Sequence, residues 1–305
     1  MSTLVMGVVN VTTDSFSDGG RYLDTGAAIS HGLALWAAGA DILDVGGEST
    51  RPGAERVDPS IERDRVVPVI RALAQRGAWI SIDTMNASTA VAAVDSGARI
   101  VNDVSGGLAD AAMLPAVAET DAEIILGHWR GPSREMYAPA QYADVAAEVT
   151  AELAERVAAA RAAGIGADRI IVDPGIGFGK RPEQNWDVLR DLPQLVAAGQ
   201  RVLLGTSRKR FLAEALAEAS VDAERRFAER TGAPATRMPG EDSPGDAGGT
   251  VAGAVSETRR DAATAVTSAL AALAGVWGVR VHDVAATRDA LRIAELWGGH
   301  DAAAR

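Results

Sequence analysis

The sequence contains no cysteine, and aromatic residues make up only 4% of it. The absence of cysteine excludes disulfides, thiolate zinc sites and cysteine nucleophiles, and it is compatible with a reducing compartment. The least polar run, near residues 269–279, is too short to span a bilayer. The amino terminus lacks the basic head and apolar stretch of a signal peptide, so we expect a cytoplasmic protein that does not enter a membrane.

Positive charge is also scarce, because 41 acidic residues outnumber 30 basic ones and give a formal net charge of −11. Such a chain repels the phosphate backbone, and no basic stripe interleaved with aromatics is present, so nucleic acid is not an expected partner. An anionic ligand would need a local cationic pocket. Lys180 and Lys209 are the only lysines, and both lie in loops that follow predicted strands.

Short runs rich in Val, Ile and Leu alternate with Ala-rich stretches of helical period, which is typical of parallel βαβ units. The predicted strands are residues 5–11, 42–45, 79–82, 100–104, 124–126, 170–172, 202–204 and 279–281. Helical stretches follow the strands, for example residues 25–38, 59–76, 144–163 and 285–297. Eight such repeats predict an α/β protein with the (β/α)8 architecture of a TIM barrel, folded as a single domain over residues 1–305.

One segment, residues 218–258, interrupts this alternation. It contains three prolines at 234, 239 and 244 together with many charges. We interpret it as a flexible insertion between the seventh helix and the eighth strand. It could be a solvated loop, or a lid or partner site.

Polar residues follow nearly every predicted strand, and in a barrel they would meet at one rim, where barrel enzymes place their chemistry. The residues are Asn10, Glu48, Asp83, Asn102, His128, Asp173, Ser207 and His282. Asp83, Asn102 and Asp173 could accept from and donate to the edge of a nitrogen heterocycle. Alternatively, Asp83 could cap the following helix and Asp173 could belong to a proline turn.

Other rim groups are suited to an anion. Arg280 and His282 lie on the same side of the eighth strand, and Lys209 lies at a strand-to-helix junction. In the first loop, Asn10, Asp14 and Asp18 could hold Mg²⁺ together with ligand phosphates, or the two aspartates could simply make Asx turns.

Seven ordered motifs together resemble the dihydropteroate synthases of folate synthesis, and they extend over nearly the whole chain. They are residues 6–20, 46–53, 81–84, 101–107, 173–179, 206–211 and 280–284. The resemblance implies a transferase that condenses 7,8-dihydropterin-6-ylmethyl pyrophosphate with p-aminobenzoate, uses Mg²⁺ and is the target of sulfonamides. The C–O bond to pyrophosphate would break first, and the arylamine would attack the resulting pterin methylene cation. A homodimer packed through the outer helices near the C-terminus is also implied.

The resemblance also implies roles for individual residues. The pterin would be held by Asp83, Asn102, Asp173 and Lys209. The pyrophosphate would be held by Asn10, Arg280 and His282, with Asn10 also a magnesium ligand. The p-aminobenzoate site would be formed by Thr50, Arg51, Pro52, Phe178 and Ser207. Phe16 and Asp18 of the first loop would join Asp173 and Lys209 in catalysis.

The chain departs from the family pattern at several points. Thr13 stands where the family usually has proline. Trp129 stands where the family has a methionine under the pterin, and we expect the pterin ring to stack on the Trp129 ring. The insertion at residues 218–258 has no counterpart in typical members. Two alternatives remain open: a catalytically silent pterin-binding paralogue, and a pterin-dependent corrinoid methyltransferase. Ser207, Arg208 and Lys209, with the anion donors Arg280 and His282, argue against the second.

Overall fold

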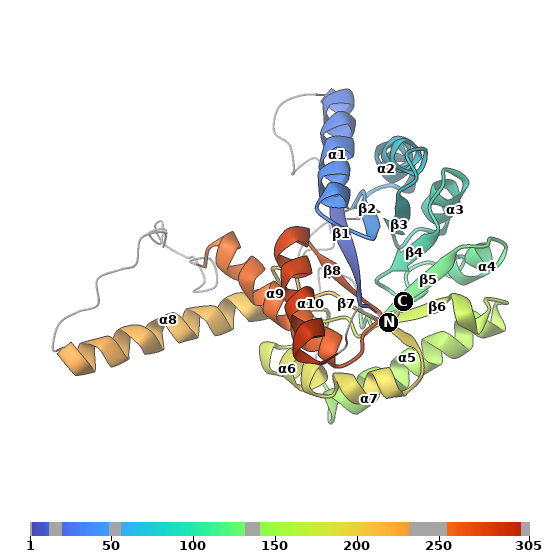
Figure 1. The fold of residues 1–305 in the computed structure, drawn as a ribbon. Helices are drawn as coiled ribbons and strands as arrows, with labels where there is room; N and C mark the ends of the chain where they lie inside the picture. The colour runs from blue at the N-terminus through green and yellow to red at the C-terminus, as the bar shows by residue number, and fades with distance from the viewer. Residues whose placement is uncertain (1, 12–19, 49–55, 132–140, 232–254, 300–305) are drawn as a thin grey trace.

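The computed structural model describes residues 2–11, 20–48, 56–131, 141–231 and 255–299 (Figure 1). Eight parallel strands close into a barrel in chain order, with β1 paired to both β2 and β8. The strands are β1 Leu4–Asn10, β2 Ile42–Gly46, β3 Trp79–Asp83, β4 Ile100–Asp103, β5 Glu123–Gly127, β6 Ile170–Asp173, β7 Arg201–Leu204 and β8 Gly278–Val281. The predicted TIM barrel and its eight strands are confirmed.

The helices surround the barrel. They are α1 Gly20–Ala37, α2 Pro59–Ala74, α3 Ala87–Asp95, α4 Met113–Ala118, α5 Val145–Ala162, α6 Pro182–Arg190, α7 Leu192–Ala197, α8 Arg210–Thr231, α9 Glu257–Leu273 and α10 Val284–Trp297, with a short 3₁₀ turn at Ala167–Arg169. Side-chain caps fix several starts, among them Asp283, which accepts from Ala286 N at 3.0 Å just after His282. None of the helices in the described ranges is long and apolar enough to cross a membrane.

The barrel interior is filled by one apolar layer below a polar one. The apolar layer consists of Met6, Ile42, Ile100, Ile125, Ile171 and Leu203, with Leu4, Trp79 and Trp277 packed against it. Because alternate residues of a strand share a face, the residues two positions further along also point inward. Those positions include Asp44, Asn102, Gly127, Asp173 and Gly205. The sequence therefore places polar groups and glycines directly above the apolar layer, at the carboxyl end of the barrel.

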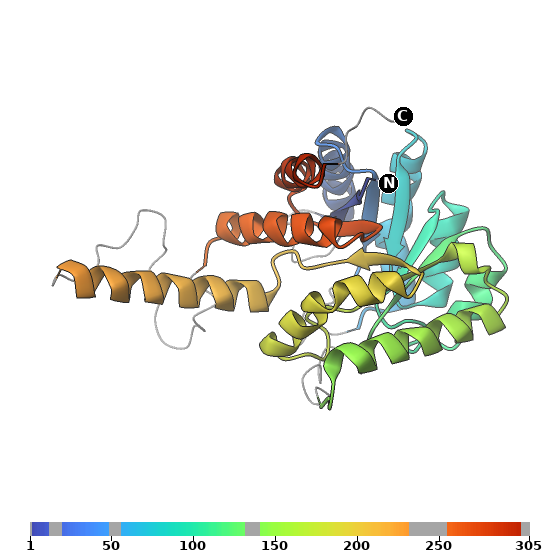
Figure 2. The ribbon, with the colours of Figure 1, turned by 60° about the horizontal axis from the view of Figure 1, so that its bottom comes forward.

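The segment predicted as a flexible insertion is partly helical. It lies between α8 and α9, as expected, but residues 218–231 continue α8 and residues 257 and 258 begin α9. The prediction was wrong for these residues because the helix formers Ala, Glu and Arg predominate up to Thr231 and the first proline comes only at position 234. Residues 232–254 lie outside the described part of the chain. Figures 1 and 2 show α8 extending away from the barrel beside α9.

Candidate active site

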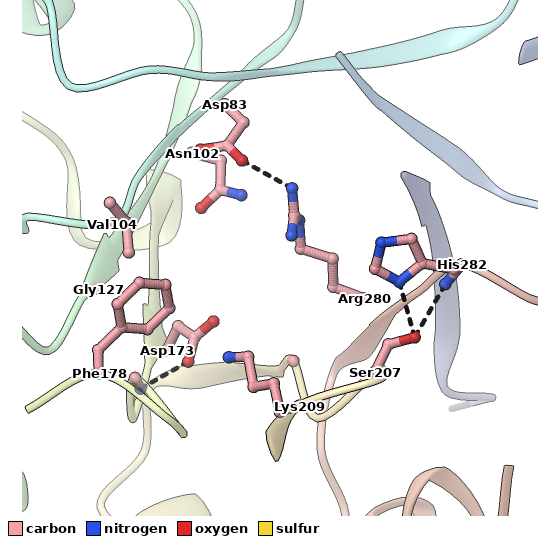
Figure 3. A pocket seen from close by; sticks show the side chains of 12 residues that line it. Asp83, Asn102, Val104, Gly127, Asp173, Phe178, Ser207, Lys209, Arg280 and His282 are labelled. Atoms are coloured by element: carbon pink, nitrogen blue, oxygen red, sulfur yellow. Dashed lines mark hydrogen bonds and ion pairs between the residues drawn. The ribbon is translucent and has the colours of Figure 1, made fainter. Parts of the chain in front are cut away.

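A pocket opens at the carboxyl end of the barrel, and residues from six strands or the loops after them line it (Figure 3). Its lining residues are Asp83, Asn102, Val104, Gly127, Asp173, Gly175, Phe178, Gly205, Ser207, Lys209, Arg280 and His282. Eight of the predicted site residues are thus brought together: Asp83, Asn102, Asp173, Phe178, Ser207, Lys209, Arg280 and His282.

The guanidinium of Arg280 lies between two carboxylates on the floor of this pocket. Its Nε donates to Asp44 Oδ2 at 2.6 Å and its Nη2 donates to Asp83 Oδ2 at 2.7 Å. Asn102 Nδ2 also donates to Asp44 Oδ2, at 3.2 Å, which turns the amide oxygen of Asn102 toward other partners. Asp44 is fully buried and was missed in the sequence analysis. An acidic residue inside the apolar run of β2, two positions after the inward-facing Ile42, was the signal for it.

The Asp83 carboxyl does not cap the following helix. The N-cap of α3 is Asn86, and Asp110 Oδ2 accepts from Ala87 N at 2.9 Å instead. Burial raises the pKa of Asp83 to about 7, although the positive charge of Arg280 opposes the shift. Asp83 is therefore a buried acid whose protonation changes near neutral pH.

Asp173 and Lys209 lie side by side on one side of the pocket, away from Asp83 and Asn102 (Figure 3). Asp173 Oδ1 accepts from Gly175 N at 2.7 Å, so this carboxylate does stabilise the turn after β6 while also lining the pocket. Burial raises the pKa of Asp173, and Lys209 opposes the rise. Burial likewise lowers the pKa of Lys209 to about 8 against the attraction of Asp173. The Lys209 ammonium lies 4.7 Å from the centre of the Phe178 ring.

Ser207 and His282 form a second polar pair at the pocket edge. Ser207 Oγ lies 2.9 Å from His282 Nδ1 and accepts from the backbone N–H of His282 at 3.1 Å. A bidentate ion pair with α9 stabilises the turn that carries Ser207: Arg208 donates to both carboxylate oxygens of Asp261, at 2.7 and 2.8 Å. Arg208 itself has a left-handed φ of 57°, which is uncommon for a residue other than glycine. Helix α9 thus fixes the segment between Ser207 and Lys209.

Trp129 follows β5 and lies next to the first pocket rather than in its lining. It lines a second cavity with Leu108, Gly127, His128, Glu152, Glu155 and Arg156, and it is not among the residues that line the first. Inward positions of β5 alternate, so Ile125 and Gly127 point into the barrel, and the chain has left the strand by Trp129. The residue of this segment that lines the first pocket is Gly127, which also lines the second cavity, and stacking of the pterin on Trp129 stays a prediction.

Asn10 ends β1 with an exposed side chain and is not part of the pocket lining. The predicted residues Phe16, Asp18, Thr50, Arg51 and Pro52 lie outside the described residues. Within the ranges that the structure covers, no group of three or more His, Cys, Asp or Glu side chains could hold a metal ion. Mg²⁺ is commonly bound through one or two protein oxygens together with water and substrate phosphates, so a dedicated cluster of acidic side chains is not required.

The fold and the pocket define a barrel enzyme whose mouth holds buried acids and cations around a space open to a polar ligand. A family model described as pterin binding enzyme matches residues 6–240. The dihydropteroate synthase of Mycobacterium leprae (strain TN) is 51% identical over 96% of this chain and 93% of its own length. The chain belongs to the dihydropteroate synthase family of pterin-binding enzymes and is a transferase, as its motifs predicted.

Solved structures agree with this assignment. The dihydropteroate synthase of Xanthomonas albilineans with 4-aminobenzoic acid has a TM-score of 0.78 and 38% identity, covering 98% of this chain and 95% of its own. The dihydropteroate synthase from the same organism in complex with 7,8-dihydropteroate has a TM-score of 0.74 and 36% identity, covering 98% and 94%.

Proposed function

We propose that the pocket condenses 7,8-dihydropterin-6-ylmethyl pyrophosphate with p-aminobenzoate to give 7,8-dihydropteroate and pyrophosphate. The observation that supports this most is the convergence of Asp83, Asn102, Asp173 and Lys209 on one pocket. Their carboxylate, amide and ammonium groups match the alternating donors and acceptors of a pterin edge, and their burial strengthens each bond. Solved structures of relatives contain 4-aminobenzoic acid, a substrate of the proposed reaction, or 7,8-dihydropteroate, its product.

The pyrophosphate would be held at the rim by Arg280, His282 and Asn10. Arg280 is already bonded to Asp44 and Asp83, so it would connect the pterin-binding acids with the leaving group. A magnesium ion held by the Asn10 amide oxygen and the substrate phosphates would neutralise the charge of the leaving pyrophosphate. The exposed position of Asn10 at the end of β1 fits a metal held mostly by substrate.

The p-aminobenzoate site would lie beside the pyrophosphate site, at Phe178 and Ser207 and at Thr50, Arg51 and Pro52 from the second loop. If the C–O bond breaks first, the pterin methylene carries positive charge. The buried carboxylates of Asp83 and Asp173 would stabilise it in a low-dielectric site. Phe16 and Asp18 of the first loop would assist by covering the reacting carbon from water.

We also propose a homodimer packed through α9 and α10. Large apolar side chains on the outer faces of these two contacting helices are between 52% and 85% exposed: Val266, Leu270, Leu273, Ile293, Leu296 and Trp297. An apolar surface shared by two neighbouring helices is typical of an interface between identical subunits.

The activity is tested by incubating the purified protein with the pterin pyrophosphate and Mg²⁺, with and without p-aminobenzoate. We expect release of pyrophosphate together with formation of dihydropteroate when the arylamine is present. Tight pterin binding without product would instead identify a silent paralogue. Absence of pterin binding would contradict the assignment of the pocket.

A further inference from the structure

The loop between β6 and α6, residues 174–181, shapes one side of the pocket through Gly175 and Phe178. It contains three glycines with left-handed φ angles, Gly175 at 63°, Gly177 at 81° and Gly179 at 60°. This sequence of conformations allows no regular secondary structure, and glycine gives the backbone many alternatives. The loop therefore needs side-chain anchors if Phe178 is to keep one position.

The only two lysines of the chain supply such anchors. Lys180 Nζ donates to Gly175 O at 3.0 Å and to Phe178 O at 3.2 Å, and Lys209 Nζ donates to Ile176 O. Three carbonyls of one loop are thus bound by the two lysine side chains from two sides. Lys209 lines the pocket, whereas Lys180 is only 1% exposed and does not line it.

Lys180 has a complete set of hydrogen-bond partners. Its third acceptor is His128 Nδ1, at 2.9 Å, so the three N–H donors of an ammonium meet three acceptors. Burial lowers the pKa of Lys180 to about 7, with Asp173 opposing the shift. An arginine could not reproduce this arrangement, because its planar fork cannot direct three bonds from one nitrogen.

His128 is held in the tautomer that accepts from Lys180. Its Nε2 lies 3.0 Å from Glu152 Oε2 on α5, and since a carboxylate only accepts, this nitrogen carries the proton. Burial and the charge of Lys180 lower the pKa of His128 to about 2, so the ring stays neutral and Nδ1 keeps its lone pair. Arg130 Nε donates to Glu152 Oε1 at 3.0 Å and fixes the carboxylate in turn.

We propose that Lys180, oriented by His128 and Glu152, is a positioning residue that fixes the 174–181 loop and so places Phe178 for the arylamine substrate. The inference rests on the proposed function for the identity of that substrate. Because Lys209 lines the pocket, it can exchange its hydrogen bond to Ile176 O for one to an incoming ligand. Lys180 is buried and keeps its hydrogen bonds to Gly175 O and Phe178 O. The two lysines therefore have different tasks: Lys209 binds and Lys180 positions.

The first test compares Lys180→Met with the wild-type protein in steady-state kinetics. Methionine keeps the length of the side chain and removes every donor. We expect the KM for p-aminobenzoate to rise about tenfold or more while the KM for the pterin pyrophosphate stays within about twofold. Lys180→Arg should not restore the wild-type KM.

Arg169→Met is the matched control for lost stability. Arg169 Nη1 also donates to two backbone carbonyls, Thr120 O and Ala122 O, but it lies before β6, at the opposite end of the barrel. It should lower the melting temperature without separating the two KM values. Equal rises of both KM values in Lys180→Met, or unchanged values in both variants, would overturn the proposal. Failure of the wild-type protein to form dihydropteroate would instead refute the proposed function.

A second pair of variants keeps the test open if Lys180→Met does not fold. His128→Asn retains an acceptor near the position of Nδ1, whereas His128→Leu removes it. We expect His128→Leu to raise the KM for p-aminobenzoate more than His128→Asn does, and to speed hydrogen exchange of the Phe178 amide, which donates to Gly175 O at 3.0 Å. The same exchange rate in both His128 variants would contradict the anchoring role.

Discussion

The Nε atom of Arg280 on β8 donates to the buried carboxylate of Asp44 on β2, although the two residues lie 236 positions apart in sequence. Asp44 is fully buried, and it shares Arg280 with Asp83. Barrel closure creates this contact, since β8 pairs with β1 and β1 with β2. A residue that touches no ligand in our proposal thus holds the cation at the centre of the site.

Asp44→Asn should therefore destabilise the protein and weaken pterin pyrophosphate binding. Asp83 still compensates the charge of Arg280 in this variant, so we expect a cost of about 1.5–3 kcal/mol, the contribution of a buried hydrogen bond between charged groups. Urea denaturation and calorimetric titration would measure the two effects. Asp187→Asn is the control, since Asp187 pairs with Arg190 on an exposed helix surface and should contribute below about 1 kcal/mol. Equal stabilities of the two variants would contradict the role of Asp44.

Pterin binding should depend on the protonation of Asp83. Burial raises the pKa of this carboxyl to about 7, so the neutral acid predominates below that pH and the carboxylate above it. A pterin N–H donates a stronger hydrogen bond to the carboxylate than to the neutral acid, so affinity should fall as pH decreases through 7, by up to about tenfold per pH unit. Calorimetry between pH 5.5 and 8.5 would measure it. Asp83→Asn should bind weakly and lose the pH dependence below pH 7, whereas deprotonation of Lys209, whose pKa burial lowers to about 8, should affect both proteins above that pH. A wild-type affinity that stays constant between pH 5.5 and 7 would exclude the mechanism.

The strands could be predicted because apolar runs and helical periods recur eight times, and the site residues because polar groups follow those runs. Which side chains contact one another could not be predicted from the sequence. The helix over residues 218–231 was missed because its many charged residues are common both in exposed helices and in loops, and we interpreted them as a loop. Which residue near the end of β5 points inward depends on the strand register, which the sequence alone does not give. Lys180 was placed correctly in a loop after β6, but only packing shows that it is buried under that loop.

Gly205 offers a way to block the pocket without disturbing the fold. A Cβ built there would lie 3.8 Å from Asp173 Oδ2 and from Lys209 Nζ, which is ordinary contact, and its backbone is not left-handed. Gly205→Ala should therefore keep the wild-type melting temperature and weaken pterin pyrophosphate binding about tenfold or more. Gly127→Ala is the contrasting variant, because its Cβ would lie 2.4 Å from Val104 O and force the backbone to move. Undiminished affinity in Gly205→Ala would show that the ligand does not reach this part of the pocket.

The proposed dimer is tested by charging the surface of α9. Leu270 is 62% exposed on a helix that contacts α10, and an arginine there would place a charge in the middle of an apolar interface. Leu270→Arg should convert a dimer into a monomer in sedimentation velocity experiments, with the far-UV circular dichroism unchanged. Val221→Arg is the control, since Val221 is 58% exposed on α8, away from the proposed face. A Leu270→Arg variant that remains dimeric, or a wild-type protein that is monomeric at micromolar concentration, would contradict this interface. Because the inner face of α9 holds Arg208 through Asp261, loss of the dimer should also raise the mobility of the turn that carries Ser207 and Lys209.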